Sequence, residues 1–406
     1  MVLLMKQISV VLAGIGGYSA KYVENILKKT DSWFRIAGVV DPYPEKSTMY
    51  SRLEDMDIPI FKTLKEFYRH KKADLAIISS PIHYHCEQTC EALENGSNVL
   101  CEKPAAATVQ EIKEMIYQRE RHRKLVAVGF QWAYDPVFLK LKQDVIAGKF
   151  GAPLRLKALV LWPRDIFYYK RTSWAGRLIM NGKFVLDSVA NNATSHFLHA
   201  MLFLIGNDLQ NSITPKAVEA ELYRVNKIES FDTCCMKIKT LSAEIMFYAS
   251  HAVNELWGPQ FAFDFEGAKI VYNDPEIPES QGKIIAIYKN RKEIYGPVEH
   301  GSMRKLWVVM ENLGKGRNEP VCTLESALSQ TLVINGAHES SEIIDFPEAV
   351  VKFDKDKSLF WVKGLSEFMK SCFEKNKLFS EMGISWAKHG RKIELDNYEF
   401  FKGGTK

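Results

Sequence analysis

The sequence of 406 residues lacks any apolar run that approaches the roughly 18 residues needed to span a bilayer. Residues 1–6 carry neither a basic segment nor a small-residue cleavage site, so we expect no secretory signal peptide. Internal repeats, low-complexity tracts and a long linker are also missing. With 46% apolar residues the chain has enough material for a full core, and its length predicts two domains.

Cysteine and net charge are both low. The seven cysteines, an odd number in a large chain, are typical of reduced thiols in a cytoplasm. The 54 basic and 49 acidic residues leave a net charge of only +5, which gives no reason to expect nucleic acid or an anionic membrane as a partner. We therefore expect a soluble, cytoplasmic protein.

A glycine-rich turn follows the first apolar strand. Residues 8–13 are predicted to form a buried strand, and residues 21–29 a helix. Between them Gly14 would make a tight turn, and Gly16, beside Gly17, would let the backbone approach a pyrophosphate at the helix N-terminus. Strand, glycine turn and helix together predict a dinucleotide site. Ser19 stands where a third glycine is expected, which weakens the match.

An acidic residue ends the second predicted strand, residues 34–40. Asp41 stands near the usual position of the carboxylate that holds the ribose hydroxyls of a dinucleotide. Such a carboxylate would repel a 2′-phosphate, so the sequence favours NAD, with NADP as the alternative. The competing interpretation of Asp41 is a turn residue before Pro42.

Alternating elements continue to residue 130 and predict a doubly wound parallel sheet. The expected helices and strands are a helix at 63–71, a strand at 73–79, a helix at 87–94, a strand at 99–101, a helix at 109–123 and a strand at 125–130.

The short strand at 99–101 stops abruptly at Glu102, Lys103 and Pro104. Proline cannot donate to a strand ladder, so the strand must end here. In an open α/β sheet ligands lie outside the carboxyl ends of the strands. Lys103 is therefore a candidate for proton chemistry, and partial desolvation is expected to lower the pKa of its amine.

The potential metal ligands of this region are His83, His85, Cys86 and Cys90. Their spacing matches no zinc pattern with two closed ligand pairs. The two cysteines are four residues apart, as on a helix face packed against a sheet. We therefore predict no metal, and interpret His85 as lining a cofactor cleft.

Six short segments in the first 131 residues occur in an order and spacing that resemble one known family. They are residues 13–17, 39–42, 79–85, 92–96, 101–104 and 128–131. The family is the glucose–fructose oxidoreductase and inositol dehydrogenase family, Gfo/Idh/MocA. The resemblance implies an NAD(P)-dependent dehydrogenase of sugars, polyols or related compounds, in which Lys103 lies beside the nicotinamide and the substrate hydroxyl. It also implies a cis peptide before Pro104 and a homo-oligomer, either a dimer or a tetramer.

The predicted site then extends along the whole cofactor cleft. The expected cofactor-binding residues are Gly14, Gly16, Gly17, Tyr18, Asp41, Ser80, Pro81, His83, His85, Glu102, Lys103 and Gln131.

From about residue 154 the pattern changes to strands followed by helices. We predict an N-terminal Rossmann domain at 1–130 and a second, α+β domain at 131–406 with a large, mainly antiparallel sheet. Alternation at residues 235–239 predicts that one face of this sheet is wet. The predicted strands are 154–161, 218–225, 234–238, 243–249, 261–265 and 269–272, and the predicted helices are 303–313, 324–340 and 359–373.

An aromatic and cationic stretch after residue 161 suits sugar stacking and hydroxyl recognition. Its candidate substrate-binding residues are Trp162, Arg164, Tyr168 and Tyr169. An equally weighted alternative is a loop that packs on the sheet or on a partner subunit.

The family resemblance implies an aspartate four residues before a histidine, then another acid three residues later. Here Asn192 precedes His196 by four residues, His199 follows it, and Asp187 lies nine residues before it. Either Asn192 fills the place of the aspartate, which we favour, or an insertion around residues 189–191 lets Asp187 reach it. We predict Lys103, His196, Asn192 and Asp187 as catalytic residues. His199 has apolar neighbours and is expected in the core.

The resulting hypothesis is hydride transfer between NAD(H) and a carbinol carbon of a carbohydrate-like substrate. Lys103 is the expected base, or His196 is, with Lys103 orienting the oxygen. Two rivals remain: a glycosidase that uses NAD for transient oxidation, and a dinucleotide-binding regulatory protein without turnover.

Overall fold

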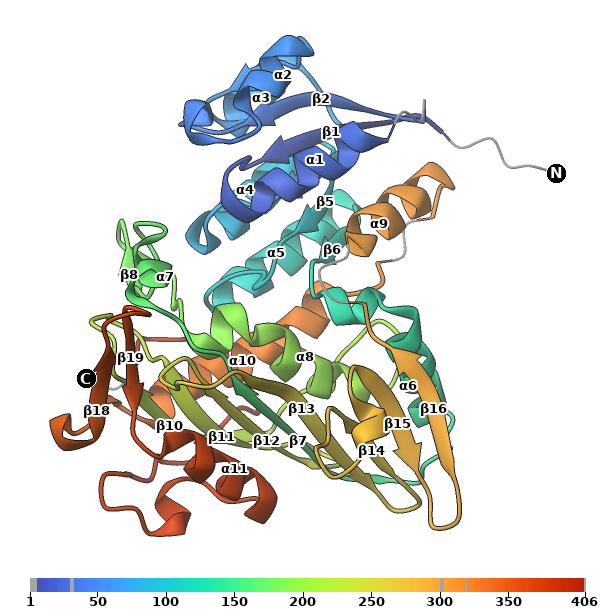
Figure 1. The fold of residues 1–406 in the computed structure, drawn as a ribbon. Coiled ribbons are helices and arrows are strands. Elements are labelled where there is room, and N and C mark those ends of the chain that lie inside the picture. Colours follow the sequence, from blue (N-terminus) through green and yellow to red (C-terminus); the bar gives the residue numbers. More distant parts are fainter. Residues whose placement is uncertain (1–5, 30–32, 300–302, 318–319, 405–406) are drawn as a thin grey trace. The chain divides into compact units, whose positions relative to one another are not determined.

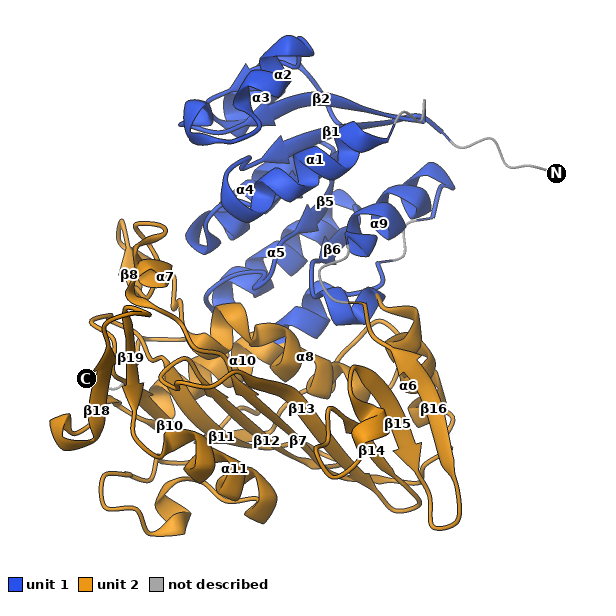
Figure 2. Ribbon diagram, in the orientation of Figure 1, with its two compact units in different colours: residues 1–134, 300–328 blue, residues 135–299, 329–406 orange. Residues whose placement is uncertain are grey.

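A computed structural model describes residues 6–29, 33–299, 303–317 and 320–404. The signal-peptide prediction concerned residues 1–6, of which 1–5 lie outside the described residues. The chain forms two compact units, and Figure 2 colours residues 1–134 with 300–328 (unit 1) and residues 135–299 with 329–406 (unit 2). The predicted division, 1–130 and 131–406, differs from these units chiefly at residues 300–328. No helix of the described residues is long and apolar enough to cross a membrane.

Unit 1 contains a six-stranded parallel sheet in the order β3-β2-β1-β4-β5-β6, which confirms the predicted doubly wound fold (Figure 1). The strand order reverses between β1 and β4, the place where such sheets bind ligands. Its elements are β1 (Ile8–Ala13), α1 (Ala20–Lys28), β2 (Phe34–Val40), α2 (Tyr50–Asp55), β3 (Ile60–Phe61), α3 (Leu64–His70), β4 (Leu75–Ile78), α4 (His85–Glu94), β5 (Asn98–Cys101), α5 (Val109–His122), β6 (Val126–Val128) and α9 (Arg304–Gly314).

The central strands of this sheet are apolar because helices cover both of its faces. Every residue of β1 and β4 is buried. The edge strand β3 has only two residues, and neither it nor α2 was predicted. Such a short strand offers no periodicity to detect, because its pairing with Val39 and Val40 of β2 defines it.

Residues 300–328 return to unit 1 through backbone contacts that join distant parts of the sequence. The Lys6 amide donates to the Gly314 carbonyl at 3.0 Å, and the Val128 amide donates to the Cys322 carbonyl at 3.0 Å. These contacts, together with α9 packing near β1, explain why the segment does not belong to the second unit. The sequence gives no local sign of contacts this far apart along the chain.

Unit 2 contains a ten-stranded sheet, mainly antiparallel, as predicted. Its path is β16-β15-β14-β13-β7-β12-β11-β10-β17, with β20 beside β10, and the pairs β7–β12 and β10–β17 are parallel. The sheet strands are β7 (Pro153–Leu161), β10 (Ala217–Arg224), β11 (Thr233–Lys239), β12 (Glu244–Ser250), β13 (Trp257–Phe265), β14 (Lys269–Tyr272), β15 (Lys283–Ile287), β16 (Lys292–Pro297), β17 (Ile343–Asp345) and β20 (Ile393–Glu394). The remaining elements are α6 (Pro136–Ile146), α7 (Ile166–Lys170), β8 (Ile179–Met180), β9 (Lys183–Phe184), a π-helix (Val189–Ala193), α8 (Ser195–Leu204), α10 (Leu324–Ser340), β18 (Val351–Asp354), β19 (Leu359–Val362) and α11 (Leu365–Lys375).

Helices cover both faces of this sheet around β10 and β11 (Figure 1). Tyr223 packs in a core cluster with residues of α11, whereas Val218, on the opposite face of β10, lies against Gly336 of α10. The prediction of one wet face is therefore wrong around β11, where Cys235 and Met236 are both fully buried. Alternation of polarity along β11 reflects Lys237, which pairs with Glu381.

The helix predicted at 359–373 divides into two elements. Residues Leu359–Val362 form β19, which pairs with β18, and α11 begins only at Leu365. Gly364, with φ +75°, separates them in a left-handed conformation that glycine adopts without strain. The prediction was wrong because the apolar run at 359–362 is too short to show a strand or helix periodicity. It is a strand only because it pairs with β18.

Candidate functional site

The glycine turn after β1 leaves room for a diphosphate. Gly14 has φ +88°, and a Cβ there would lie 2.9 Å from the Ser79 carbonyl oxygen at the end of β4. Gly16 and Gly17, by contrast, face open space, with no heavy atom within 4 Å of a Cβ at either position. A cradle that a side chain would fill fits the pyrophosphate of a dinucleotide at a helix N-terminus.

The contacts of Ser19 explain why a serine, and not a third glycine, occupies this position. The residue is buried, and its hydroxyl donates to the Ser79 carbonyl at 2.5 Å and lies 2.8 Å from the Ser79 hydroxyl. It thereby joins the turn after β1 to the end of β4. Tyr18, a predicted cofactor residue, is partly exposed, and its hydroxyl lies 3.9 Å from the Met303 sulfur.

Asp41 lies at the end of β2 and contacts the same glycine turn. Its Oδ2 accepts a hydrogen bond from the Ile15 amide at 3.1 Å, and its Oδ1 accepts one from the Tyr43 amide at 2.9 Å. The second bond spans two residues, as in the turn role considered for Asp41. The first places a half-exposed carboxylate beside the proposed diphosphate cradle. The turn role is therefore observed, and the contact with the ribose hydroxyls stays a prediction.

The turn after β4 carries Ser80, Pro81, His83 and His85. The Ser80 hydroxyl donates to Gln88 Oε1 at 2.6 Å, Pro81 precedes a short 3₁₀ turn, and His83 is buried within that turn. His85 is fully buried, and its two ring nitrogens lie 2.9 Å from the Pro104 carbonyl and 2.8 Å from the Ser80 carbonyl. Burial lowers the pKa of His85, although both carbonyls favour its charged form. His85 therefore ties the turns after β4 and β5 together.

Glu102, immediately after β5, is the centre of a buried polar cluster. Its Oε1 accepts a hydrogen bond from the Tyr22 hydroxyl at 2.5 Å and forms an ion pair with Lys305 Nζ, and its Oε2 accepts one from the Lys103 amide at 3.0 Å. Burial raises the pKa of Glu102, but Lys305, Tyr22 and Lys103 outweigh burial and hold that pKa below its usual value. The carboxylate is thus charged, and it fixes the backbone of Lys103.

Lys305 is a residue that the sequence interpretation missed. Its side chain is 1% exposed, and its ammonium also donates to the Gly129 carbonyl at 3.2 Å. A Cβ at Gly129 would lie 3.2 Å from both the lysine nitrogen and Glu102 Oε1, so a side chain there would require this cluster to shift by a few tenths of an ångström. The available signal was spacing, because Lys305 shares a helix face with the buried residues Val309 and Met310.

Lys103 is half-buried, and its peptide to Pro104 is cis, as the resemblance implied. Because β1 pairs with β4 and β4 pairs with β5, the residues after these strands meet at one edge of the sheet. This edge brings together Gly14, Ser80 and Lys103. Gln131, a further predicted cofactor residue, is half-buried in the turn after β6.

In unit 2 the structure joins Asp187 to Asn192. The Asn192 Nδ2 donates to Asp187 Oδ1 at 2.7 Å, and the Gly176 amide donates to Asp187 Oδ2 at 2.6 Å. Asp187 and Asn192 meet because the chain between Asp187 and the start of α8 forms a π-helix, Val189–Ala193, whose wide turn brings Asn192 back to Asp187. Asp187 therefore does not precede His196 on one continuous α-helix, and the irregular turn lies where the alternative of an insertion around residues 189–191 required it. Asp187 is 3% exposed, and Arg171 Nη2 lies 3.9 Å from its Oδ2.

His196 follows this π-helix in the first turn of α8 and is half-buried. Because Lys103 belongs to unit 1 and His196 to unit 2, their pairing stays a prediction. His199 is fully buried, and its ring stacks on Phe203 at 5.5 Å. Burial lowers the pKa of His199 well below its usual value, as does Lys142, in keeping with a core role.

The aromatic stretch after β7 packs around Arg171, whose positive charge faces Asp187. The Arg171 guanidinium lies 3.8 Å from the centroid of the Tyr168 ring, and the Arg164 guanidinium lies 5.0 Å from the same centroid. Trp162 is tied to the sheet, because its indole N–H donates to the Gly258 carbonyl at 3.2 Å. This contact favours the packing alternative for Trp162.

His251, at the end of β12, was not predicted. Its Nδ1 lies 2.9 Å from the Tyr169 hydroxyl, and its buried Nε2 has no hydrogen-bond partner among the described residues. Burial, then the cations of Arg164 and Arg171, lower the pKa of His251 well below its usual value. The ring is therefore neutral at neutral pH. No sequence signal marked it, because its partner lies 82 residues away.

The cysteines and histidines near residue 86 form no metal site in the part of the chain that the structure describes, which contains no cluster of three suitable side chains. The Cys86 thiol donates to the Glu111 carbonyl of α5 at 3.4 Å. Cys86 therefore packs α4 against α5.

Comparison with known proteins finds that residues 8–130 match the model of an oxidoreductase family described by its NAD-binding Rossmann fold, GFO_IDH_MocA. An inositol 2-dehydrogenase from Rubrobacter xylanophilus is 29% identical over 161 residues, 39% of this chain and 45% of that protein. A 2,7-anhydro-N-acetylneuraminate hydratase from Mediterraneibacter gnavus is 28% identical over 125 residues, 31% of this chain and 32% of that protein. The chain thus matches less than half the length of these relatives.

Solved structures share the fold over most of the chain. The WlbA dehydrogenase from Bordetella pertussis, in complex with NADH and UDP-GlcNAcA, has a TM-score of 0.66 at 18% identity, covering 82% of this chain and 97% of its own. An aldose-aldose oxidoreductase from Caulobacter crescentus, complexed with glycerol, has a TM-score of 0.64 at 18% identity, covering 82% and 98%. Residues 8–130 thus match the NAD-binding Rossmann domain of the Gfo/Idh/MocA oxidoreductase family.

Proposed function

We propose that the protein transfers a hydride between NAD(H) and the hydroxyl-bearing carbon of a sugar, a polyol or a sugar derivative. The observation that carries this proposal is the edge of the unit 1 sheet, where Gly14, Ser80 and Lys103 follow three adjacent strands. It is supported by the names of an inositol dehydrogenase and an aldose oxidoreductase among the related proteins.

Oxidation of a carbinol removes a hydride from carbon and a proton from oxygen. NAD, when bound, supplies the hydride acceptor. Lys103 supplies an amine at the strand end, and Glu102 fixes its backbone through the bond to the Lys103 amide. In the proposed reaction this amine takes or orients the hydroxyl proton. His196 is the alternative base, with Lys103 then holding the oxygen.

The proposed substrate side is the Asp187 cluster of unit 2. Asp187 and Asn192 together offer carboxylate and amide groups that hydrogen-bond hydroxyls, and Arg171 holds the negative charge in place. The Tyr168 ring stacks on the Arg171 guanidinium, which therefore faces Asp187 on one side and Tyr168 on the other. We propose that Tyr168, Tyr169 and Arg164 shape this substrate side.

A panel assay tests this function. Purified protein with NAD is mixed in turn with inositols, other polyols, aldoses and uronic acids, and NADH absorbance is followed. We expect NADH to form with at least one polyol or sugar and not with simple primary alcohols. If no member of the panel yields NADH, and NADH is not consumed with the matching ketones, the proposal is overturned.

The preference for NAD is tested at Asp41. Asp41→Asn keeps a hydrogen-bond acceptor for the Ile15 amide and removes the charge that repels a 2′-phosphate. We expect the ratio of the NADP to the NAD dissociation constant to fall at least about tenfold, which corresponds to about 1.4 kcal/mol. Fluorescence titration measures both constants, with Asp55→Asn as an exposed control. Equal affinity of the unaltered protein for the two cofactors would remove the role assigned to Asp41.

A reaction without net oxidation is the second candidate, favoured by the similarity to the 2,7-anhydro-N-acetylneuraminate hydratase. Its signature would be turnover that needs bound NAD but accumulates no NADH. Release of nitrophenol from a nitrophenyl glycoside, or hydration of an anhydro sugar, with constant NADH absorbance would support this candidate over the first.

A further inference from the structure

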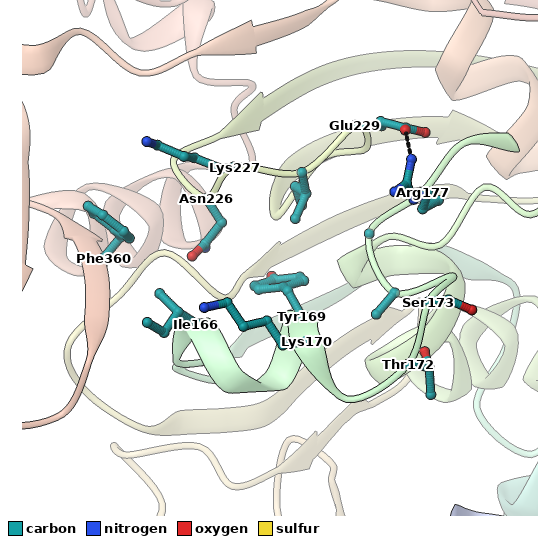
Figure 3. A pocket seen from close by; sticks show the side chains of 13 residues that line it. Ile166, Tyr169, Lys170, Thr172, Ser173, Arg177, Asn226, Lys227, Glu229 and Phe360 are labelled. Atoms are coloured by element: carbon teal, nitrogen blue, oxygen red, sulfur yellow. Dashed lines mark hydrogen bonds and ion pairs between the residues drawn. The ribbon is translucent and has the colours of Figure 1, made fainter. Parts of the chain in front are cut away.

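Unit 2 contains a pocket of about 730 Å³ in which Tyr169 is the only lining residue with a part in the proposed reaction (Figure 3). The pocket is bounded by α7, the loop after α7, the loop between β10 and β11, and Phe360 of β19. Its volume falls in the range of roughly 300–1,000 Å³ that is usual for small-molecule sites.

Asn226 presents a fixed, unsatisfied oxygen to this pocket. The residue is 5% exposed, and its Nδ2 donates to Asp232 Oδ2 at 2.8 Å. The same Oδ2 accepts from the backbone amides of Val225 and Asn226, so it is an acceptor and the amide cannot be turned over. Asn226 Oδ1 has no hydrogen-bond partner among the described residues. In Figure 3 this side chain points into the space between Ile166, Lys170 and Phe360.

A buried acceptor without a partner destabilises the folded protein. A ligand that donates a hydroxyl to Asn226 Oδ1 would offset this loss of stability. The hydroxyls of Thr172 and Ser173 line the same pocket and can bond further ligand hydroxyls. These groups favour a polyhydroxylated ligand.

The charge of the lining is positive. Lys170, Arg177 and Lys227 give three positive charges and Glu229 one negative charge, which leaves +2. Arg177 already pairs with Glu229 at 2.6 Å. Within the described part of the chain, neither Lys170 nor Lys227 forms an ion pair with a carboxylate. Two lysines without a counter-ion attract an anionic group.

Apolar groups complete the pocket. The rings of Tyr169 and Phe360 and the side chain of Ile228 line it, and such surfaces pack against the C–H face of a sugar ring. We propose that this pocket binds a small polyhydroxylated anion, a sugar acid or a sugar phosphate. The hydroxyls are held by Asn226 and the anionic group by Lys170 and Lys227.

The pocket shares two residues with the framework around Asp187. Gly176 lines the pocket, and its amide donates to Asp187 Oδ2 at 2.6 Å. Tyr169 also lines it, and its hydroxyl contacts His251. A ligand in the pocket therefore touches the loop that holds Asp187, but its binding does not depend on NAD or on hydride transfer.

Isothermal titration of the full chain, without cofactor, tests the proposal with three probes: D-glucuronate, D-glucose 6-phosphate and neutral D-glucose. We expect at least one of the two anions to bind at least tenfold more tightly than glucose, and its affinity to fall as salt rises. The comparison of glucuronate with glucose 6-phosphate separates a carboxylate site from a phosphate site.

Two double variants carry the same change of charge. Lys170→Ala with Lys227→Ala should weaken anion binding at least tenfold. Lys352→Ala with Lys363→Ala, which removes two exposed lysines of the same unit outside the pocket, should leave it unchanged. Retention of anion binding in the first variant, an equal loss in both, or no preference for either anion in the unaltered protein overturns the proposal. None of these outcomes depends on NADH formation, so the proposed function stands or falls separately.

Discussion

Glu102 precedes Lys103 in the sequence and also holds its backbone in place. The carboxylate is 5% exposed, yet it bonds Tyr22, Lys305 and the Lys103 amide. A buried charge of this kind is tolerated only when it is paired and hydrogen-bonded. The position of Lys103 thus depends on Lys305, which lies 203 residues from Glu102 in the sequence.

Lys305→Met tests this dependence through stability. The change leaves a buried carboxylate without its counter-charge, so we expect a loss of about 3–5 kcal/mol at pH 7 in urea denaturation. Lys315→Met, on an exposed ion pair just after the same helix, should cost less than about 1 kcal/mol. Equal costs for the two variants would contradict the buried-pair account.

The pH dependence of that loss follows from the pKa of Glu102. Because this pKa is lower in the folded protein, the carboxylate stabilises the fold above its unfolded pKa of about 4.3. That contribution disappears as the pH falls through the folded pKa. The difference between the unaltered protein and Lys305→Met should therefore shrink below about pH 4. Urea midpoints collected from pH 7 downwards measure it, and a constant difference would count against an ionised Glu102.

Asp187 and Asn192 act as one group if the proposed substrate side is correct. Asp187→Asn keeps the size of the side chain and removes the charge that faces Arg171. We expect kcat for NADH formation to fall about 100-fold or more, the range of a lost acid–base or orienting group. Asp208→Asn, on an exposed loop of the same unit, is the control. Unchanged kcat in Asp187→Asn would remove Asp187 from the site.

At the scale of elements, the glycine turn after β1 separates the requirements of folding from those of binding. Gly14 is needed by the fold, because its φ is +88° and the end of β4 leaves no room for a Cβ. Gly16 has an ordinary φ of −95° and faces open space. The fold therefore requires glycine at position 14, whereas the proposed diphosphate site requires glycine at position 16, although the two are only two residues apart.

Alanine at each glycine distinguishes these roles. Gly14→Ala should lower the free energy of unfolding by about 1–3 kcal/mol, because it combines a left-handed φ with a backbone clash. Gly16→Ala should leave stability within about 0.5 kcal/mol. It should weaken NAD binding at least about tenfold, because the methyl group fills the diphosphate cradle. Urea denaturation and NADH fluorescence titration measure both quantities, and normal NAD binding by Gly16→Ala would refute the cradle.

Elements with their own periodicity could be predicted from the sequence, and elements defined by distant partners could not. The bounds of β1, β2 and α10 agree with the predicted residues, and β1 and β2 are continuous apolar runs that can be recognised without their pairing partners. The two-residue β3 and the strand β19 exist only through pairing with other strands. The π-helix before α8 has no sequence signature, and the sequence analysis could offer an insertion around residues 189–191 only as one of two alternatives.

For the whole molecule, the sequence predicted two units and one edge of a sheet but not the path of the chain between them. Residues 300–328 return to unit 1, and Lys305 comes with them. Motif matching could propose Lys103 and Asp41, since these follow strands closely. It could not find Lys305 or His251, whose partners lie 203 and 82 residues away.

The most direct test of the proposed function is the rate of NADH formation by Lys103→Met, with a substrate identified by the panel and saturating NAD. The change removes the amine and keeps the length of the side chain. We predict a fall of at least about 100-fold with NAD affinity retained, while Lys72→Met, at an exposed position of the same unit, keeps the original rate. A Lys103→Met protein that forms NADH within twofold of the original rate would contradict the account.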